Sequence, residues 1–351
     1  MSGIASSPVS HSPHFRSHFP HRRAGHCGSG ALRDLMEFHE VDFGAGALSE
    51  GAVFGLGGGL GFLYVEVPDQ KPPIYLVGRG ADMERDIAQH LEIPLEVRAS
   101  DDAEEGWRWV REELDGGRPP MVWADIGHLE YLRVKMHNTR HDIVVVDYDE
   151  AEGITWIADN DRDELQPCSL DSLARARSSD AFPGPARHTT FLYDWRRGVA
   201  DPRSAVKAAI RRAVDNMRAG GAINPWPGGA FGLAGVELFA DSYPRWPDIF
   251  EENLPDALRA LDVFIVKAGT GGAMFRSLQA TFLREMALLL DDLALSALGH
   301  LYGALASLWR TLAGCARVED HARGLSTVEE INRLEHLGVS LQENWLAKES
   351  R

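Results

Sequence analysis

The chain has 351 residues, 44% of them hydrophobic, and a net charge of −16. This length suits two domains, and the acidic balance argues against a general nucleic-acid binder while fitting a small cationic substrate such as an amine. Three widely spaced cysteines and the lack of a long apolar stretch argue against a disulfide framework, a structural zinc site, a secretory signal and a membrane span, so we expect a cytoplasmic protein.

The N-terminal part of the chain changes character at about residue 20. Residues 1–20 are rich in Ser, His and Pro, which predicts a disordered tail; its histidines fit no ligand spacing, and we expect no metal site. Residues 21–195 have a mixed pattern that we interpret as one domain. Its predicted strands are 74–77, 95–97, 120–125, 141–148 and 153–158, and its predicted helices include 82–91 and 104–114.

The remaining residues, 196–351, are predicted to form a mostly α-helical domain. Apolar stripes at helical spacing predict helices at 203–217, 275–292 and 293–312, which we expect to form a bundle. A mixed N-terminal domain followed by a helical domain predicts the α+β class.

In the first domain, the glycine-rich run 55–61 lacks the spacing of a dinucleotide-binding loop, and we interpret it as a turn or a tight packing loop.

Cys27 is the first candidate for chemistry. It opens a predicted helix whose residues Leu32, Leu35 and Met36 share one apolar face, and a helix N-terminus favours the nucleophilic thiolate over the thiol. The glycines on both sides of the cysteine allow close approach of a substrate. The alternative is that a lone cysteine at a helix start is a small buried hydrophobe.

A histidine and a carboxylate follow in a predicted hairpin. His141 begins the strand 141–148, and Asp159 follows its partner strand 153–158. Antiparallel pairing brings the start of one strand close to the end of the next, so Asp159 is expected beside His141. With Cys27 as nucleophile, His141 as base and Asp159 as orienting group, the order matches a papain-like Cys–His–Asp site. Taken alone, His141 could cap a strand and residues 159–161 could form a turn.

Several short segments carry a family resemblance. Residues 25–29 (GHCGS), 53–60 (VFGLGGGL), 123–125 (WAD) and 159–162 (DNDR) are similar to the N-terminal domain of the butirosin biosynthesis protein H family, and the cysteine helix and hairpin resemble papain-like peptidases that process bacteriocin leaders. Residues 231–233 (FGL) and 269–276 (GTGGAMFR) resemble the helical domain that often follows. The resemblance implies a papain-like acyltransferase with an antiparallel sheet, which moves an acyl or aminoacyl group from a carrier protein to an amine in antibiotic or other secondary-metabolite biosynthesis. It implies no cofactor other than the phosphopantetheine of the donor acyl carrier protein.

The peptidases carry a glutamine shortly before the cysteine as an oxyanion donor, whereas this chain has no glutamine there. We expect the Cys27 backbone N–H to serve, with His21 or His26 as second donor. Asp125 and Asn160 are further candidates to line the site, although Asp125 could equally organise a turn.

The function retains alternatives. A hydrolase, either thioesterase or peptidase, would use the same residues, and a catalytically idle binding module would keep the fold. Carrier proteins are generally acidic, so docking requires a basic patch. One candidate is the pair Arg22 and Arg23 beside Cys27, and the other is a helical stripe; both could also be solvated surface. The stripe consists of Arg203, Lys207 and Arg211. We expect no nucleic-acid or membrane partner, and a homo-oligomer is compatible with the sequence.

Overall fold

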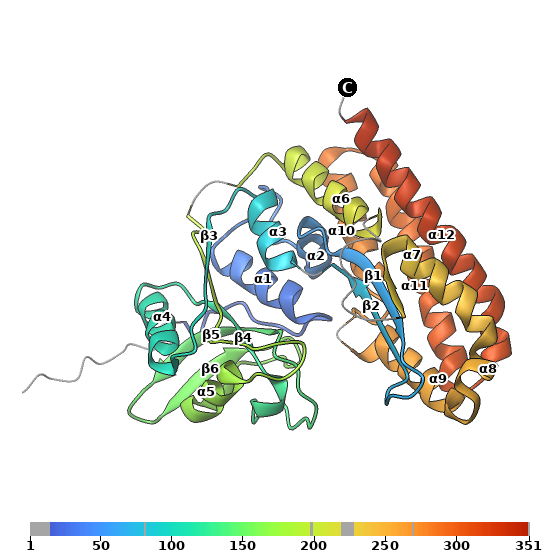
Figure 1. The fold of residues 1–351 in the computed structure, drawn as a ribbon. Helices are drawn as coiled ribbons and strands as arrows, with labels where there is room; N and C mark the ends of the chain where they lie inside the picture. Colours follow the sequence, from blue (N-terminus) through green and yellow to red (C-terminus); the bar gives the residue numbers. More distant parts are fainter. Residues whose placement is uncertain (1–14, 81, 197–198, 219–227, 269, 350–351) are drawn as a thin grey trace, which may run out of the picture. The chain divides into compact units, whose positions relative to one another are not determined.

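The computed structural model describes residues 15–80, 82–196, 199–218, 228–268 and 270–349, and the chain divides into two compact units (Figure 1). Among the described residues, the sheet unit contains 15–23 and the segment Glu96–Leu192. The helical unit contains Ala24–Leu95 and the chain from Tyr193 onward. Each unit is thus built from two separate stretches of sequence.

The sheet unit is organised by a six-stranded sheet with the order β3-β8-β4-β5-β6-β7. The strands are β3 (Leu95–Arg98), β4 (Met121–Ala124), β5 (His141–Asp149), β6 (Ile154–Ala158), β7 (Gln166–Ser169) and β8 (Thr190–Tyr193). The helices are α4 (Ala103–Asp115), the short 3₁₀ helix η1 (Ile126–His128) and α5 (Leu170–Ser178). β5 is rich in β-branched residues and is buried along nearly its whole length, as expected for a central strand covered on both faces.

Local sequence signals explain why these elements begin and end where they do. Asp102 caps α4 by accepting hydrogen bonds from the backbone N–H groups of Glu104 and Glu105, and Gly116 follows the last turn. Ser169 caps α5 in the same way through Ser172. The pairing of β5 with β6 is antiparallel, with Val144 opposite Ala158.

The disordered tail predicted for residues 1–20 requires a correction. Residues 1–14 lie outside the described residues, but residues 15–20 pack on the sheet unit. The Arg16 guanidinium pairs with Asp147 at 2.9 Å and lies 3.7 Å from the centre of the Trp156 ring. Phe19 is only 7% exposed. Burial of one aromatic ring and an ion pair are interactions that a compositional argument does not detect.

The helical unit combines a small sheet with the C-terminal helices. Its sheet has the order β2-β1-β9, with β1 (Leu60–Glu66), β2 (Ile74–Arg79) and β9 (Gly229–Phe231). Its α-helices are α1 (Cys27–Phe38), α2 (Glu50–Leu56), α3 (Met83–His90), α6 (Pro202–Arg218), α7 (Gly232–Ser242), α8 (Trp246–Phe250), α9 (Leu254–Asp262), α10 (Arg276–Leu290), α11 (Leu293–Arg317) and α12 (His321–Lys348). Two 3₁₀ turns, η2 (Tyr243–Arg245) and η3 (Glu251–Asn253), and a π-helical turn, η4 (Val263–Lys267), complete it.

The units divide the chain differently from the predicted domains 21–195 and 196–351. β9 pairs with β1 so that Leu63 lies opposite Phe231. This pairing joins residues from the first predicted domain to the C-terminal helices through main-chain hydrogen bonds. The predicted domain boundaries stay a prediction, whereas the compact units follow from this long-range pairing.

A buried ion pair lies in the core of the helical unit. Arg276 donates from Nε to Glu335 at 2.7 Å, and both side chains are 0% exposed. Arg276 also donates to the carbonyls of Gly61 and Gly78, so that one side chain connects the small sheet to α12. The indole N–H of Trp309 donates to the same Glu335 oxygen.

Within the described residues, each helix is too short or too polar to cross a lipid bilayer.

The predicted α+β class is confirmed, and the predicted strands and longest helices are present with ends shifted by a few residues. The run 55–61 connects α2 to β1, the reverse of the strand-to-helix order of a dinucleotide site. It is a tight packing segment, because a Cβ atom on Gly55 would lie 1.9 Å from the Phe282 ring and one on Gly61 would lie 2.6 Å from the Arg79 backbone. The papain-like arrangement stays a prediction.

Candidate functional site

His141 and Asp159 form a buried pair in the sheet unit. The hairpin of β5 and β6 brings them together as its pattern predicts, with His141 Nε2 2.8 Å from Asp159 Oδ2. Asp159 is 1% exposed and His141 is 9% exposed. The predicted proximity is therefore present, while the catalytic role of the pair stays a prediction.

The environment of Asp159 keeps its carboxylate charged. Burial alone would raise its pKa, but the nearby His141 charge and ring, the backbone N–H of Asp161 and the Tyr131 hydroxyl together lower the pKa of Asp159 to about 2. Burial and the Asp159 charge raise the pKa of Tyr131, so its hydroxyl stays protonated and donates to Asp159 at 2.8 Å. An ionised carboxylate only accepts hydrogen bonds, so His141 donates to it from Nε2, and Nδ1 is the ring atom left to take or give a proton.

Cys27 lies in the helical unit, at the first position of α1. His26 is the N-cap residue, and its Nδ1 accepts the backbone N–H of Ser29 at 3.2 Å. The half-buried thiol therefore lies at the positive end of a twelve-residue helix, where negative charge on sulfur is stabilised.

Glu50, the first residue of α2, holds the turn that precedes Cys27. Its carboxylate accepts the backbone N–H groups of Gly25 and His26, both at 2.9 Å, and the Ser29 hydroxyl at 3.0 Å. Because one carboxylate accepts all three hydrogen bonds, it fixes the path of the chain into α1. Glu50 was not predicted from the sequence, because an acidic residue in the first turn of a helix has an ordinary explanation in the helix dipole.

His26 caps α1, while its role as second oxyanion donor stays a prediction. Its ring is 3% exposed and packs edge-on against Phe275 at 5.2 Å. Its backbone N–H is bonded to Glu50 and its Nδ1 accepts from Ser29. These contacts make His26 a structural cap of α1.

Glu84 is a second acidic residue that sequence reasoning missed. It lies in the first turn of α3 and is 4% exposed. Burial raises the pKa of Glu84, the positive charge of Arg79 opposes this rise, and Cys27 adds to it. The buried carboxyl group of Glu84 therefore interacts electrostatically with the Cys27 thiol. The two residues are far apart in the sequence, so no local pattern indicates this interaction.

The other predicted lining residues lie in the sheet unit. His21 lines a cavity of about 420 Å³ together with Arg16, Phe19 and Trp156. Asn160 is half-buried and follows Asp159 in the turn after β6.

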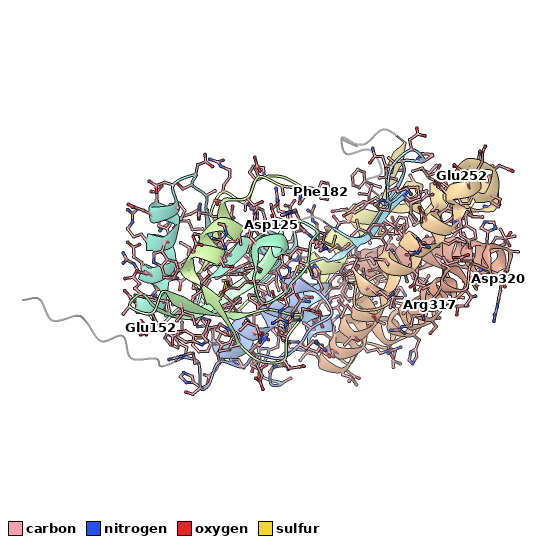
Figure 2. All side chains as sticks on the ribbon, turned by 90° about the horizontal axis from the view of Figure 1, so that it is seen from below. Asp125, Glu152, Phe182, Glu252, Arg317 and Asp320 are labelled. Atoms are coloured by element: carbon pink, nitrogen blue, oxygen red, sulfur yellow. The ribbon has the colours of Figure 1, made fainter. Side chains whose placement is uncertain are left out.

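Asp125 follows β4 and is fully buried (Figure 2). It organises a turn by accepting hydrogen bonds from the backbone N–H groups of Gly127 and Asn138 and from the Ser179 hydroxyl. His137 Nδ1 also lies 2.8 Å from its Oδ2. Of the two readings of Asp125, these contacts support the structural one.

The same carboxylate belongs to a group of candidate metal ligands. In the part of the chain that the structure describes, ligand atoms of Asp125, His128 and His137 lie within 4.8 Å of one another. The hydrogen bonds to Asp125 account for its carboxylate without an ion. The sequence did not indicate this group, because the two histidines are separated by an irregular loop.

The predicted basic stripe on α6 is largely engaged within the chain. Arg203 pairs with the Glu349 carboxylate at 3.0 Å, and Lys207 donates to the Glu349 backbone carbonyl at 2.7 Å. Arg211, the third member, is exposed. The Glu349 carboxylate thus neutralises part of the positive charge that the docking of an acidic carrier protein would need.

Comparison with protein families agrees with the two-part pattern of the chain. Residues 26–160 match the family described as butirosin biosynthesis protein H, N-terminal. Residues 171–344 match a domain of unknown function, DUF4872. The chain thus has the architecture of the butirosin biosynthesis protein H family, an N-terminal domain of that description followed by DUF4872. No curated protein matches it.

The family resemblance predicted from the sequence is thereby confirmed, and the family takes its name from an antibiotic biosynthetic protein. Neither matched region coincides with a compact unit. The sheet unit takes residues 96–160 from the first region and residues 171–192 from the second. The candidate residues are likewise divided, with Cys27 in the helical unit and His141 and Asp159 in the sheet unit.

Proposed function

We propose that this protein is an acyltransferase with Cys27 as nucleophile. It takes an acyl or aminoacyl group from the phosphopantetheine thioester of an acyl carrier protein and passes it to a small-molecule amine. The observation that carries the proposal is the His141–Asp159–Tyr131 hydrogen-bond chain, because it holds an imidazole in one orientation beside a carboxylate that is charged at neutral pH.

The first step forms a thioester on the enzyme. The Cys27 thiolate attacks the thioester carbonyl, the bond to the pantetheine sulfur breaks, and that sulfur leaves as a thiol by taking the proton held at His141 Nδ1. One thioester replaces another, so the step is close to isoenergetic and requires no nucleotide. Glu50 supports it by fixing the turn that presents Cys27 at the helix N-terminus.

The second step transfers the acyl group to the amine. The amine nitrogen attacks the Cys27 thioester, His141 takes the amine proton at Nδ1, and the cysteine sulfur leaves as an amide forms. Asp159 stabilises the imidazolium through Nε2. This joint action of Cys27 with His141 is papain-like, and its support is the order of the residues in the chain together with the family match.

The proposal is tested by intact-protein mass spectrometry with acyl N-acetylcysteamine thioesters as donors. We expect an adduct of one acyl group on the wild-type chain and none on Cys27→Ala. Cys168→Ala is the matched control and should acylate normally, since Cys168 is 1% exposed and burial raises its pKa to about 11. Acylation of Cys27→Ala to the wild-type extent would refute the nucleophile.

The fate of the adduct distinguishes transfer from hydrolysis. Addition of an amine should discharge the wild-type adduct as an amide, and His141→Ala should retain it. Discharge to the free acid at the same rate with and without amine would assign the chain to the hydrolases. If His141→Ala also leaves the pH profile of iodoacetamide labelling at Cys27 unchanged, the thiol and the imidazole do not act together.

A further inference from the structure

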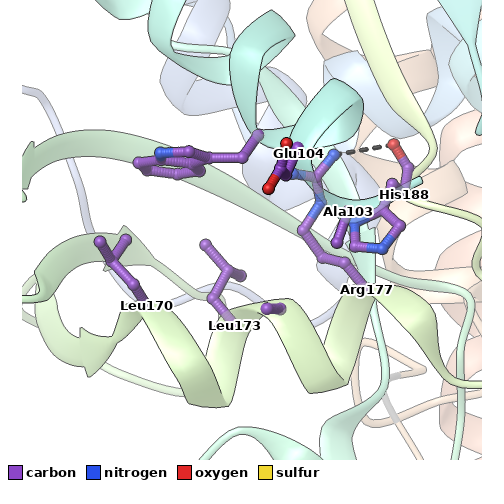
Figure 3. A pocket seen from close by; sticks show the side chains of 8 residues that line it. Ala103, Glu104, Leu170, Leu173, Arg177 and His188 are labelled. Carbon is purple, nitrogen blue, oxygen red and sulfur yellow. Dashed lines mark hydrogen bonds between the residues drawn. The ribbon is translucent and has the colours of Figure 1, made fainter.

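The sheet unit contains a small cavity between α4 and α5, separate from the residues used above (Figure 3). Its volume is about 230 Å³, large enough for a small organic molecule. Figure 3 shows Leu170 and Leu173 at one end and Arg177 and His188 at the other. The cavity thus has an apolar end and a polar end.

Arg177 at the polar end is a buried cation without a carboxylate partner among the described residues. It is 1% exposed, and it donates to the carbonyls of Gly106 and His188 and to the Thr190 hydroxyl. Its Nε has no hydrogen-bond partner within the described chain. Burial lowers the pKa of Arg177 to about 9, which still leaves the guanidinium charged at neutral pH. A buried charge with an unused donor is unfavourable unless an anion compensates it.

His188 adds a second unsatisfied polar group at the same end. It is 2% exposed, and its Nε2 has no partner in the described part of the chain. Arg187 and His188 both have positive φ, 49° and 48°, a conformation that is strained for a non-glycine residue. Close packing holds the ring in place, since a Cβ atom on Gly106 would lie 2.5 Å from His188 Cβ.

Apart from Glu104, an exposed residue that also lines it, the rest of the cavity suits an apolar body. Leu170, Leu173 and Ala174 line it from α5, and Trp107 lines it from α4. The Trp107 N–H donates to Glu150, so the polar atom of the indole is already satisfied. Ala103, the first residue of α4, also lines the cavity and adds the positive end of that helix dipole.

We propose that this cavity binds a small carboxylic acid with an apolar body. The carboxylate would lie at Arg177 and His188, where it accepts the Arg177 Nε–H and compensates the buried charge. The apolar body would lie against Trp107, Leu170 and Leu173. The site is independent of the acyl transfer proposed above, because it uses none of the same side chains.

A matched pair of ligands tests the charge requirement on the wild-type chain. Phenylacetate and phenylacetamide have nearly the same shape, and only the first carries a carboxylate. Isothermal titration calorimetry should show at least tenfold tighter binding of phenylacetate, about the value of one charge-assisted hydrogen bond. Equal affinity for the two compounds, or no binding of phenylacetate up to about 10 mM, would overturn the proposal.

Two variants locate the site. Arg177→Met should remove the preference for the acid, and Ala174→Phe, which fills the cavity without touching an Arg177 hydrogen bond, should remove binding of both compounds. Wild-type affinity in Ala174→Phe would place the bound acid elsewhere and refute the site. Because the ligand comparison needs only the wild-type chain, misfolding of a variant does not affect it.

The imidazole of His188 provides a readout that a purely structural Arg177 would not change. Burial and the Arg177 charge lower the pKa of His188 to about 4, against the opposing charges of Asp101 and Asp102. A carboxylate bound at Arg177 should raise the midpoint of the His188 titration in NMR spectra, and phenylacetamide should not. An unchanged midpoint at saturating phenylacetate would contradict the placement of the carboxylate.

Discussion

Replacing Asp159 with asparagine tests how the hairpin holds His141. Oδ2 of Asp159 accepts from both His141 and Tyr131, while Oδ1 accepts the backbone N–H of Asp161 at 3.1 Å. Asparagine has only one carbonyl oxygen, so its amide N–H₂ must face a donor on one of these two sides. The substitution therefore removes a charge and creates a donor–donor conflict in a site that is 1% exposed.

The expected loss of stability follows from the pKa of Asp159. Its decrease from the ordinary value of 3.8 to about 2 corresponds to about 2 kcal/mol of stabilisation at neutral pH, at about 1.4 kcal/mol per pKa unit. Because the folded-state pKa is lowered, this contribution is complete above the unfolded value and is lost as the pH falls through about 2. Asp159→Asn should thus unfold about 2 kcal/mol more easily at pH 7 and should lose less stability on acidification.

Urea unfolding at pH 7 and at several acidic values, followed by tryptophan fluorescence, measures both effects. Hydrogen exchange of the β5 amides reports the sheet unit alone, in case the two units unfold separately. Asp161→Asn is the control, since that side chain is 61% exposed, and it should change stability by no more than about 0.5 kcal/mol. An Asp159→Asn chain with wild-type stability at pH 7 and an unchanged acid response would refute the reasoning.

Three further predictions concern the helical unit. At pH 7 iodoacetamide should label Cys27 at least about tenfold faster than the buried Cys168, as determined by peptide mass spectrometry; equal rates would argue against an activated thiol. Glu50→Ala should lower the rate of Cys27 acylation about tenfold or more, because the preceding turn loses three hydrogen bonds; a wild-type rate would show that the turn does not need the carboxylate. Glu335→Ala should destabilise the chain by about 3–5 kcal/mol in urea unfolding by leaving the Arg276 charge buried and unpaired. Removal of the exposed Glu330 from its pair with Arg333 should cost less than about 1 kcal/mol, and a similar loss in both variants would contradict the role of burial.

Much of the hairpin could be predicted because its signals are local. His141 begins β5, and Asp159 directly follows β6, to which β5 is connected by a short turn. The antiparallel pairing of the two strands brings these residues together without any contact from distant parts of the chain. The same holds for α1, where the apolar face of Leu32 and Leu35 and the glycines beside Cys27 mark the start of a helix. The sequence did not indicate Tyr131, because an aromatic residue in an irregular loop has no periodic partner.

The sequence by itself determined the local structure of this protein: the strands, the long helices, the position of Cys27 at a helix start and the family. Only the tertiary structure decided which distant segments meet. Glu50 bonds to the backbone at Gly25, β9 pairs with β1, and Arg276 meets Glu335. Arg177 likewise reaches the backbone of Gly106 across 71 residues of chain. Such contacts depend on side-chain shape and on the compensation of buried polar groups, neither of which leaves a periodic signal in the sequence.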